Sequence, residues 1–193
     1  MAHYFTNDNI EHNRKIIKVK IKNQDFQFIT DNGVFSKKGM DFGTRTLLEN
    51  LNYDEIKGNI LDFGCGYGSI GIVVSKLTNL EVDMLDINKR SISLAQENSK
   101  LNKVKTNIFE SNIYENVTKK YDYIITNPPI RVGNEILHKI LFEAHEHLNE
   151  NGQLWIVVNK DQGAKSLIEK LKKTYNVNVI TKNKGFFVIL CLK

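Results

Sequence analysis

A repeating alternation of short apolar segments with amphipathic segments runs through most of the chain and restricts its fold more than any other feature. The sequence predicts strands at residues 59–63, 80–85, 105–109, 121–126 and 153–158, and a closing pair at 177–181 and 186–192. Helices are predicted at about 69–77, 89–101, 134–148 and 163–173. Strands that alternate with helices form a mostly parallel sheet with helices on both faces. We therefore expect an α/β fold in which the final hairpin adds an antiparallel edge.

A different pattern, alternation of polar and apolar residues, occupies the chain before residue 31. Two such runs, at 15–22 and 26–29, flank a short polar turn and predict a β-hairpin. A loop at 31–44 and a short helical stretch to about Leu51 lead into the strand and helix alternation. Because no flexible linker interrupts the chain, we expect one domain over residues 1–193. It would consist of a hairpin extension at 1–32 and a core at 33–193.

Composition excludes several protein classes. A hydrophobic fraction of 41% and a charged fraction of 25% are ordinary for a soluble globular protein. No apolar run is long enough to cross a bilayer, and the first residues do not read as a signal peptide, so we expect a cytoplasmic protein without membrane contact. Cys65 and Cys191 are far apart and form no CxxC pair. Neither a zinc site nor any other metal site is therefore expected.

The strongest local motif is the glycine-rich run at residues 62–68, DFGCGYG, between the first predicted strand of the alternation and a helix. Glycines allow positive φ and let a ligand approach the backbone, while the helix start offers free N–H groups. This arrangement indicates a nucleotide-like ligand. Residues 66–71 also match the GxGxxG pattern, so an NAD-binding oxidoreductase is an alternative, and a turn without any ligand is another.

Two acids bear on the choice of cofactor. Asp86 ends the next strand, twenty residues after Gly66, where its carboxylate can accept hydrogen bonds from ribose hydroxyls in either cofactor. Asp62 precedes the first glycine by two residues and would help hold the ammonium of a methionine moiety, directly or through water. The combination favours S-adenosylmethionine over NAD.

The fourth predicted strand ends at residues 127–130, NPPI, which hold both prolines of the chain. Two prolines fix the backbone, so the Asn127 side chain and the nearby carbonyls are held rigidly. The Asn127 Oδ1 and the Pro128 carbonyl could accept the two N–H groups of a planar amine and favour the pyramidal nitrogen that attacks a methyl group. Such a transfer needs no metal and no strong base. A simple strand terminator is the alternative reading of this motif.

These motifs resemble the class I methyltransferases of the ribosomal RNA small-subunit guanine-N2 type, in a short single-domain form. The resemblance covers about Gly33 to Lys193 and includes residues 33–44, which look like that family's segment closing over the cofactor. It implies a Rossmann-like, seven-stranded, mostly parallel sheet in which the last strand is inserted antiparallel. The function implied is S-adenosylmethionine-dependent methylation of the exocyclic N2 of a guanine in 16S ribosomal RNA.

The expected site residues follow from the motifs and the resemblance. The catalytic residues would be Asn127 and Pro128; the cofactor would contact Phe35, Asp41, Thr44, Asp62, Gly64, Gly66, Gly68, Asp86, Ile87, Asn112 and Asn127; the substrate would contact Asn127, Pro129, Ile130 and Arg131. Two positions depart from the family pattern. Asn112 stands where the family has an adenine-contacting acid, and Ile130 replaces an aromatic residue that stacks on a flipped base. Arg131 could stack or contact phosphate instead.

Ribosomal RNA or the small ribosomal subunit is the expected partner. The net charge of +5 is concentrated toward the two ends of the chain, and lysines near phosphates raise affinity for RNA. The lysines in question are Lys15, Lys18, Lys20, Lys22, Lys182 and Lys184. Two alternatives remain open besides the oxidoreductase: a protein glutamine N5-methyltransferase, which uses a similar Asn-Pro-Pro motif, and a non-catalytic RNA-binding or ribosome assembly factor.

Overall fold

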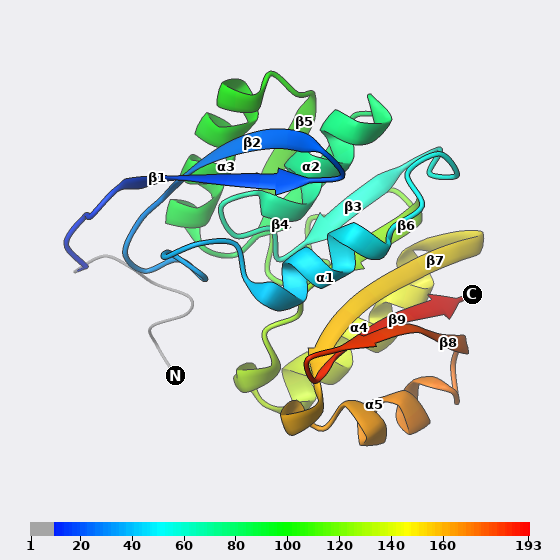
Figure 1. The fold of residues 1–193 in the computed structure, drawn as a ribbon. Helices are drawn as coiled ribbons and strands as arrows, with labels where there is room; N and C mark the ends of the chain where they lie inside the picture. The colour runs from blue at the N-terminus through cyan, green and yellow to red at the C-terminus, as the bar shows by residue number, and fades with distance from the viewer. Residues whose placement is uncertain (1–9) are drawn as a thin grey trace.

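The protein was analysed as a computed structural model that describes residues 10–193, apart from the side chain of Arg131. A seven-stranded sheet forms its centre, with strand order β5-β4-β3-β6-β7-β9-β8 (Figure 1). The strands of this sheet are β3 (Ile60–Phe63), β4 (Val82–Asp86), β5 (Thr106–Glu110), β6 (Tyr121–Thr126), β7 (Leu148–Asn159), β8 (Asn176–Asn183) and β9 (Phe186–Leu192). The helices are α1 (Phe42–Asn50), α2 (Ser69–Thr78), α3 (Lys89–Asn102), α4 (Asn134–His147) and α5 (Ala164–Leu171), with short 3-10 turns η2 (Ile130–Val132) and η3 (Lys160–Gln162).

The sheet is parallel except for its last strand in the sequence. Strands β3 to β7 pair in parallel, whereas β9 lies between β7 and β8 and is antiparallel to both. This confirms the Rossmann-like fold with one antiparallel strand. The hairpin pattern alone suggested that the antiparallel strand would lie at the edge of the sheet. Instead it lies inside the sheet, and β8 forms the edge. Largely apolar β9 suits an interior position, while β8 carries Asn, Thr and Lys residues that suit an edge.

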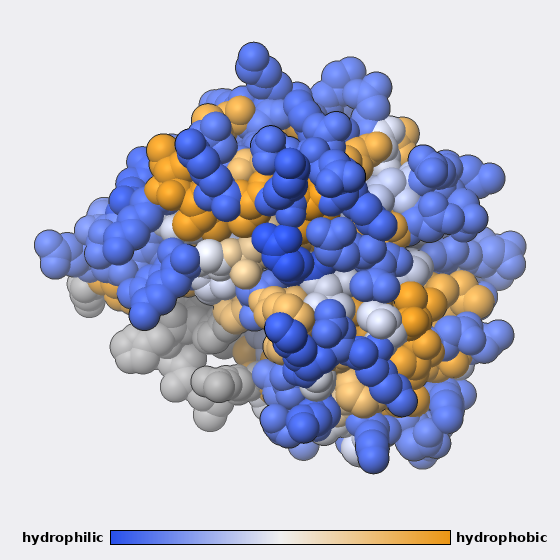
Figure 2. All heavy atoms as spheres, in the orientation of Figure 1, coloured by the Kyte–Doolittle hydropathy of each residue, from blue (hydrophilic) through white to orange (hydrophobic). Residues whose placement is uncertain are grey.

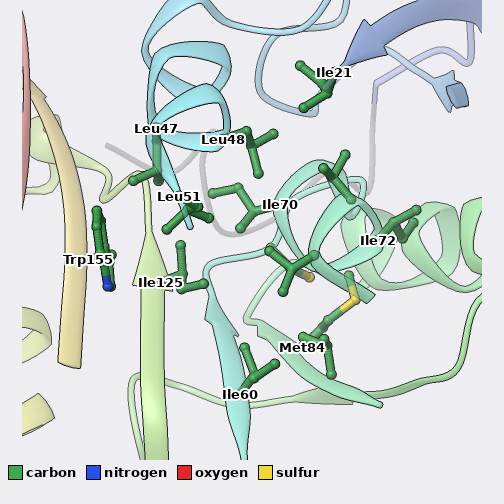
Figure 3. Packing of buried hydrophobic residues seen from close by; sticks show 14 of the residues in the cluster. Ile21, Leu47, Leu48, Leu51, Ile60, Ile70, Ile72, Met84, Ile125 and Trp155 are labelled. Atoms are coloured by element: carbon green, nitrogen blue, oxygen red, sulfur yellow. The ribbon is translucent and has the colours of Figure 1, made fainter. Parts of the chain in front are cut away.

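Two apolar layers cover the sheet on opposite faces. One face packs against α1, α2 and α3, with the β1–β2 hairpin lying against α3 and α1, and the other packs against α4 and α5 (Figure 1). Figure 3 shows Leu48 of α1 and Leu51, directly after α1, beside Ile70 of α2 and Ile125 of β6. All four belong to the buried core, which fixes α1 over the strand that carries the Asn-Pro-Pro motif.

The N-terminal hairpin, β1 (Lys15–Ile21) and β2 (Gln24–Thr30), forms a separate two-stranded sheet, as expected. The free edge of β2 is satisfied by side chains of α3. Asn98 exchanges hydrogen bonds with the backbone of Ile29 (2.6 and 2.9 Å) and also donates to the Tyr67 carbonyl (2.8 Å). The hairpin therefore supports the glycine loop through one buried asparagine. On the face of the molecule that Figure 2 shows, most surface residues are hydrophilic, although hydrophobic residues are visible over the β1–β2 hairpin.

The predicted element boundaries hold to within a few residues, with one larger difference. Strand β7 begins at Leu148, directly after α4, because Leu148 already pairs with Tyr121 of β6. Residues 111–120, for which no helix or strand was predicted, connect β5 to β6 through turns. Among residues 10–193, no helix is long and apolar enough to cross a membrane.

Candidate active site

A cavity of about 770 Å³ opens at the carboxyl ends of β3, β4, β6 and β7. It lies where the strand order reverses between β3 and β6, the usual ligand position in an open α/β sheet. Most of the residues expected at the site line this cavity: Phe35, Asp41, Thr44, Gly64, Gly66, Asp86, Ile87, Asn112, Asn127, Pro128, Pro129 and Ile130. Asp62 and Gly68 do not line it. The Arg131 side chain lies outside the described part of the structure.

The three alternate glycines of the loop have positive φ and two different roles. At Gly64 and Gly66, with φ of 69° and 56°, an added Cβ would meet no protein atom within 4 Å. Because both glycines line the cavity, a side chain there would extend into it. At Gly68, an added Cβ would lie 2.8 Å from the Ile72 Cδ1 and 3.0 Å from the Met84 Cε. Gly68 therefore allows α2 to pack closely on β4, which explains its absence from the cavity wall.

Asp86 joins the end of β4 to the glycine loop. Its Oδ2 accepts a hydrogen bond from the Gly66 N–H (2.8 Å), and its Oδ1 accepts one from the Asn88 N–H (2.9 Å). Burial raises the pKa of this carboxyl above its usual value, while the backbone donors act in the opposite direction. A carboxylate has about four lone-pair positions. Asp86 can therefore accept further hydrogen bonds from a ligand in the cavity.

Asp62 is buried behind the loop rather than in the cavity wall, with an exposed fraction of 1%. Its Oδ2 accepts a hydrogen bond from the Gly71 N–H at the start of α2 (2.7 Å). Its Oδ1 is buried and has no partner among the described residues. Burial raises the pKa of Asp62 to about 7, and the nearby Asp86 charge adds to this increase. An unpaired carboxylate oxygen favours a cation or a water molecule nearby.

The Asn127 side chain has a fixed orientation at the end of β6. Its Nδ2 donates to the Thr44 Oγ1 (2.9 Å) and to the Asp41 Oδ2 (3.1 Å). Asp41 is itself held as the N-cap of α1, because the same oxygen accepts from the Thr44 N–H (3.0 Å). A carboxylate can only accept, so the amide nitrogen must face Asp41. The Asn127 Oδ1 is then left as an acceptor without a partner among the described residues.

A second amide in the cavity wall, that of Asn112, is oriented in the same way. Its Nδ2 donates to the Glu115 Oε1 (2.7 Å), so its carbonyl oxygen is available as an acceptor. The amide thus offers the kind of acceptor atom that an acid would offer at this position, without the charge.

Sequence reasoning missed part of the wall that comes from β7, η3 and β9. Asn159 lines the cavity at the end of β7, Asp161 and Gln162 line it from η3, and Phe186 lines it at the start of β9. Because β7 is parallel to β6, its end lies at the same edge of the sheet as Asn127. The strand-end reasoning that identified Asp86 and Asn127 could have identified Asn159 as well. Within residues 10–193, no group of His, Cys, Asp and Glu side chains could hold a metal ion.

The family model and the named relatives that match this chain all point to methyltransferases. The model of the methyltransferase small domain matches residues 25–190. A relative from Bacillus subtilis, the uncharacterized protein YbxB, is 40% identical over 99% of this chain and 98% of its own length. The ribosomal RNA small subunit methyltransferase C of Psychromonas ingrahamii is 32% identical over 92% of this chain and 52% of its own length. The Haemophilus influenzae protein of the same name is 35% identical over 70% of this chain and 42% of its own length.

The solved structures support the same fold. The T. thermophilus 16S rRNA N2 methyltransferase RsmC, solved with AdoMet and guanosine, superposes with a TM-score of 0.83 at 23% identity. That match covers 93% of this chain and 50% of the RsmC chain. A Pyrococcus furiosus methyltransferase superposes with a TM-score of 0.68 at 22% identity, covering 84% of this chain and 90% of its own. The chain thus spans about half the length of the rRNA methyltransferases that it matches.

Proposed function

The chain belongs to the methyltransferase small-domain family, and from this premise we propose that it is an S-adenosylmethionine-dependent N-methyltransferase. Its substrate would be the exocyclic N2 of a guanine in 16S ribosomal RNA, free or in the small ribosomal subunit. The observation that carries the proposal is the fixed Asn127 amide, which presents an acceptor in the same cavity as the glycine loop. The names of the rRNA methyltransferase relatives support the choice of substrate. Residues 33–193 would form the catalytic core and residues 1–32 the hairpin extension.

The residues present fit S-adenosylmethionine better than NAD. Gly64 and Gly66 form a cradle that any Cβ would fill. The loop N–H groups that a pyrophosphate would need are already used: that of Cys65 donates to the Leu85 carbonyl, that of Gly66 to Asp86 and that of Gly68 to the Cys65 carbonyl. The unpaired Asp62 Oδ1 instead favours a cationic group such as the methionine ammonium, reached through water because Asp62 does not line the cavity.

In the proposed reaction, this chain's residues bind and orient the two reactants. When bound, S-adenosylmethionine supplies a methyl group on a positively charged sulfur, which a nitrogen lone pair can displace. Asp86 would accept from the ribose hydroxyls, and the Asn112 carbonyl oxygen would accept from the adenine amine. Asn127 Oδ1 and the Pro128 carbonyl would accept the two N–H groups of the substrate amine. These acceptors stabilise the amine nitrogen as its lone pair leaves the conjugated ring to bond the methyl carbon and positive charge develops on the nitrogen; the methylated nitrogen then releases one proton to water.

The position of the acceptor depends on α1. Asp41 and Thr44 hold the Asn127 amide nitrogen, so the carbonyl oxygen cannot rotate away from the cavity without losing two hydrogen bonds. We infer that both residues act as positioning residues for the acceptor, in addition to lining the cavity. Preorganised dipoles of this kind contribute to rate because they need no rearrangement during the reaction.

Methyl transfer to small ribosomal subunits tests the proposal. Purified protein would be incubated with methyl-labelled S-adenosylmethionine and small subunits from cells that lack the protein, followed by digestion to nucleosides. We expect label in N2-methylguanosine, and none with Asn127→Ala. Label in N6-methyladenosine would contradict the base assignment.

The other functions predict distinct results, each in its own assay. A protein glutamine N5-methyltransferase would label a release factor rather than RNA. An oxidoreductase would bind NAD in preference to S-adenosylmethionine in calorimetry. A non-catalytic RNA-binding factor would bind RNA equally well with and without Asn127→Ala and would transfer no methyl group.

A further inference from the structure

The turn that follows β7 has a set of polar groups whose orientation is fixed and which the proposed reaction does not use. Asn159, Asp161 and Gln162 all line the cavity. The Asn159 Oδ1 accepts from the Asp161 N–H (3.0 Å), and the Gln162 Oε1 accepts from the Asn159 N–H (3.1 Å). These two bonds form a capping box around η3.

The capping box determines which atoms remain available to a ligand. Both amide oxygens are occupied by backbone N–H groups, so the NH₂ groups of Asn159 and Gln162 remain as donors. Asp161 lies between them in the sequence, is exposed, and forms no ion pair with any described residue. The turn therefore offers one carboxylate acceptor and two amide NH₂ groups as donors.

The sheet register places this turn beside Asn127. Thr126 of β6 pairs with Ile156 of β7, so Asn127 lies next to Val157, and Asn159 is two residues farther along. At a strand rise of about 3.3 Å per residue, Asn159 lies roughly 7 Å beyond Asn127 along the strand. A planar base whose amine is held at Asn127 can therefore extend its polar edge toward η3.

We propose that η3 recognises the Watson–Crick edge of guanine, with Asp161 accepting from N1–H and the amides of Asn159 and Gln162 donating to O6. This inference rests on the proposed function, because Asn127 and Pro128 hold the adjacent 2-amino group. Along this edge guanine presents its 2-amino group, N1–H and O6 in order. The 2-amino group would meet the acceptor at Asn127, N1–H would meet the Asp161 carboxylate, and O6 would meet the amide donors of η3 and its N-cap. In adenine, N1 is an acceptor and would face the Asp161 carboxylate, which is also an acceptor. The C6 amine is a donor and would face the amide donors, so neither hydrogen bond could form.

Nucleosides that share the 2-amino group test this assignment. In 2,6-diaminopurine riboside, N1 is an acceptor and C6 carries an amine, but the 2-amino group is unchanged. Binding of this nucleoside and of guanosine to the full chain would be measured by calorimetry, with and without S-adenosylhomocysteine. We expect the wild type to prefer guanosine by about tenfold or more. Asp161→Asn should reduce that preference about tenfold, because an amide can donate to the N1 lone pair.

Glu150→Gln is the matched control, because it removes one exposed negative charge near the other end of β7. It should leave both nucleoside affinities unchanged. Equal affinities of the wild type for the two nucleosides, an unchanged preference in Asp161→Asn, or no saturable guanosine binding would each overturn the assignment. Failure of the wild type to bind S-adenosylhomocysteine would instead contradict the proposed function, so the two failures are distinguishable.

Discussion

Two amide side chains in the cavity wall have orientations set by carboxylates that lie at very different sequence distances. Glu115 orients Asn112 from three residues away, whereas Asp41 orients Asn127 from 86 residues away. The sequence could identify Asn127 and Asp86, because both end parallel strands and must therefore lie at one edge of the sheet. It could not show that α1 fixes the Asn127 amide, because that contact depends on how α1 packs over β6.

Thr44→Val tests the positioning of Asn127. The substitution keeps the buried volume of the side chain but removes the Oγ1 that accepts from the Asn127 Nδ2. We expect kcat for methyl transfer to fall about tenfold while the affinity for S-adenosylmethionine stays within about twofold. Thr44→Ser should restore most of the rate. Steady-state kinetics and calorimetry would measure the two quantities separately.

Thr46→Val is the matched control on the same helix. Thr46 is equally buried, but its hydroxyl donates to the Phe42 carbonyl within α1. Its loss should leave kcat nearly unchanged. If both valine variants lose the same activity, or if Thr44→Val weakens only cofactor binding, Thr44 does not act through Asn127.

Asp62 should make the free energy of unfolding depend on pH. Burial raises its pKa in the folded protein from 3.8 to about 7, so the folded chain keeps a proton that the unfolded chain has lost between these pH values. Stability from this group is present at low pH and is lost as the pH rises through 7. Asp62→Asn, which does not titrate, should therefore gain stability relative to the wild type between pH 5 and pH 8.

Urea unfolding of both proteins without cofactor would measure this difference. Asp86 titrates in both proteins, so its contribution largely cancels in the comparison. A stability difference that does not change with pH would show that Asp62 is ionised in the folded protein throughout this range.

At the scale of elements, the order of strands and helices could be predicted because each has a clear period and apolar run. The position of β9 inside the sheet could not be derived from periodicity, since it depends on which edge of the β8–β9 hairpin pairs with β7. The resemblance to a known family supplied that detail. The wall formed by η3 was missed because Asp161 and Gln162 form no motif typical of a binding site.

Two glycines of the loop, Gly64 and Gly66, face the ligand cavity, and the third, Gly68, is needed for packing. Gly68→Ala should destabilise the protein by about 2 to 4 kcal/mol, because its φ is positive and its Cβ would contact α2 and β4. Gly64→Ala should cost only about 1 to 2 kcal/mol through backbone strain but should abolish cofactor binding. Chemical denaturation and calorimetry would separate the two effects. Equal loss of stability in both variants would contradict this division.

At the scale of the whole molecule, exposed lysines lie near the cavity as well as on the N-terminal β1–β2 hairpin. Lys182 and Lys184 are in the β8–β9 hairpin, where the Lys184 Nζ lies 5.2 Å from the centre of the Phe42 ring. Neither lysine forms an ion pair with a described residue. Phe186, two residues after Lys184, lines the cavity, and we propose that these lysines contact the backbone of the RNA substrate.

Replacing Lys182 and Lys184 with alanine should weaken rRNA binding and lower the slope of log affinity against log salt by about one to two. Cofactor affinity should not change. Lys173→Ala, two residues after the end of α5, is the control and should change neither property. Filter binding at several salt concentrations would measure the slopes. An unchanged slope in the double variant would exclude phosphate contacts by these lysines.

The most direct test of the central claim is nucleoside mass spectrometry of 16S ribosomal RNA from cells with and without the protein. We predict that one N2-methylguanosine is lost in cells without it and is restored by the wild-type chain but not by Asn127→Ala. An unchanged N2-methylguanosine content in cells that lack the protein, or full restoration by Asn127→Ala, would contradict the account.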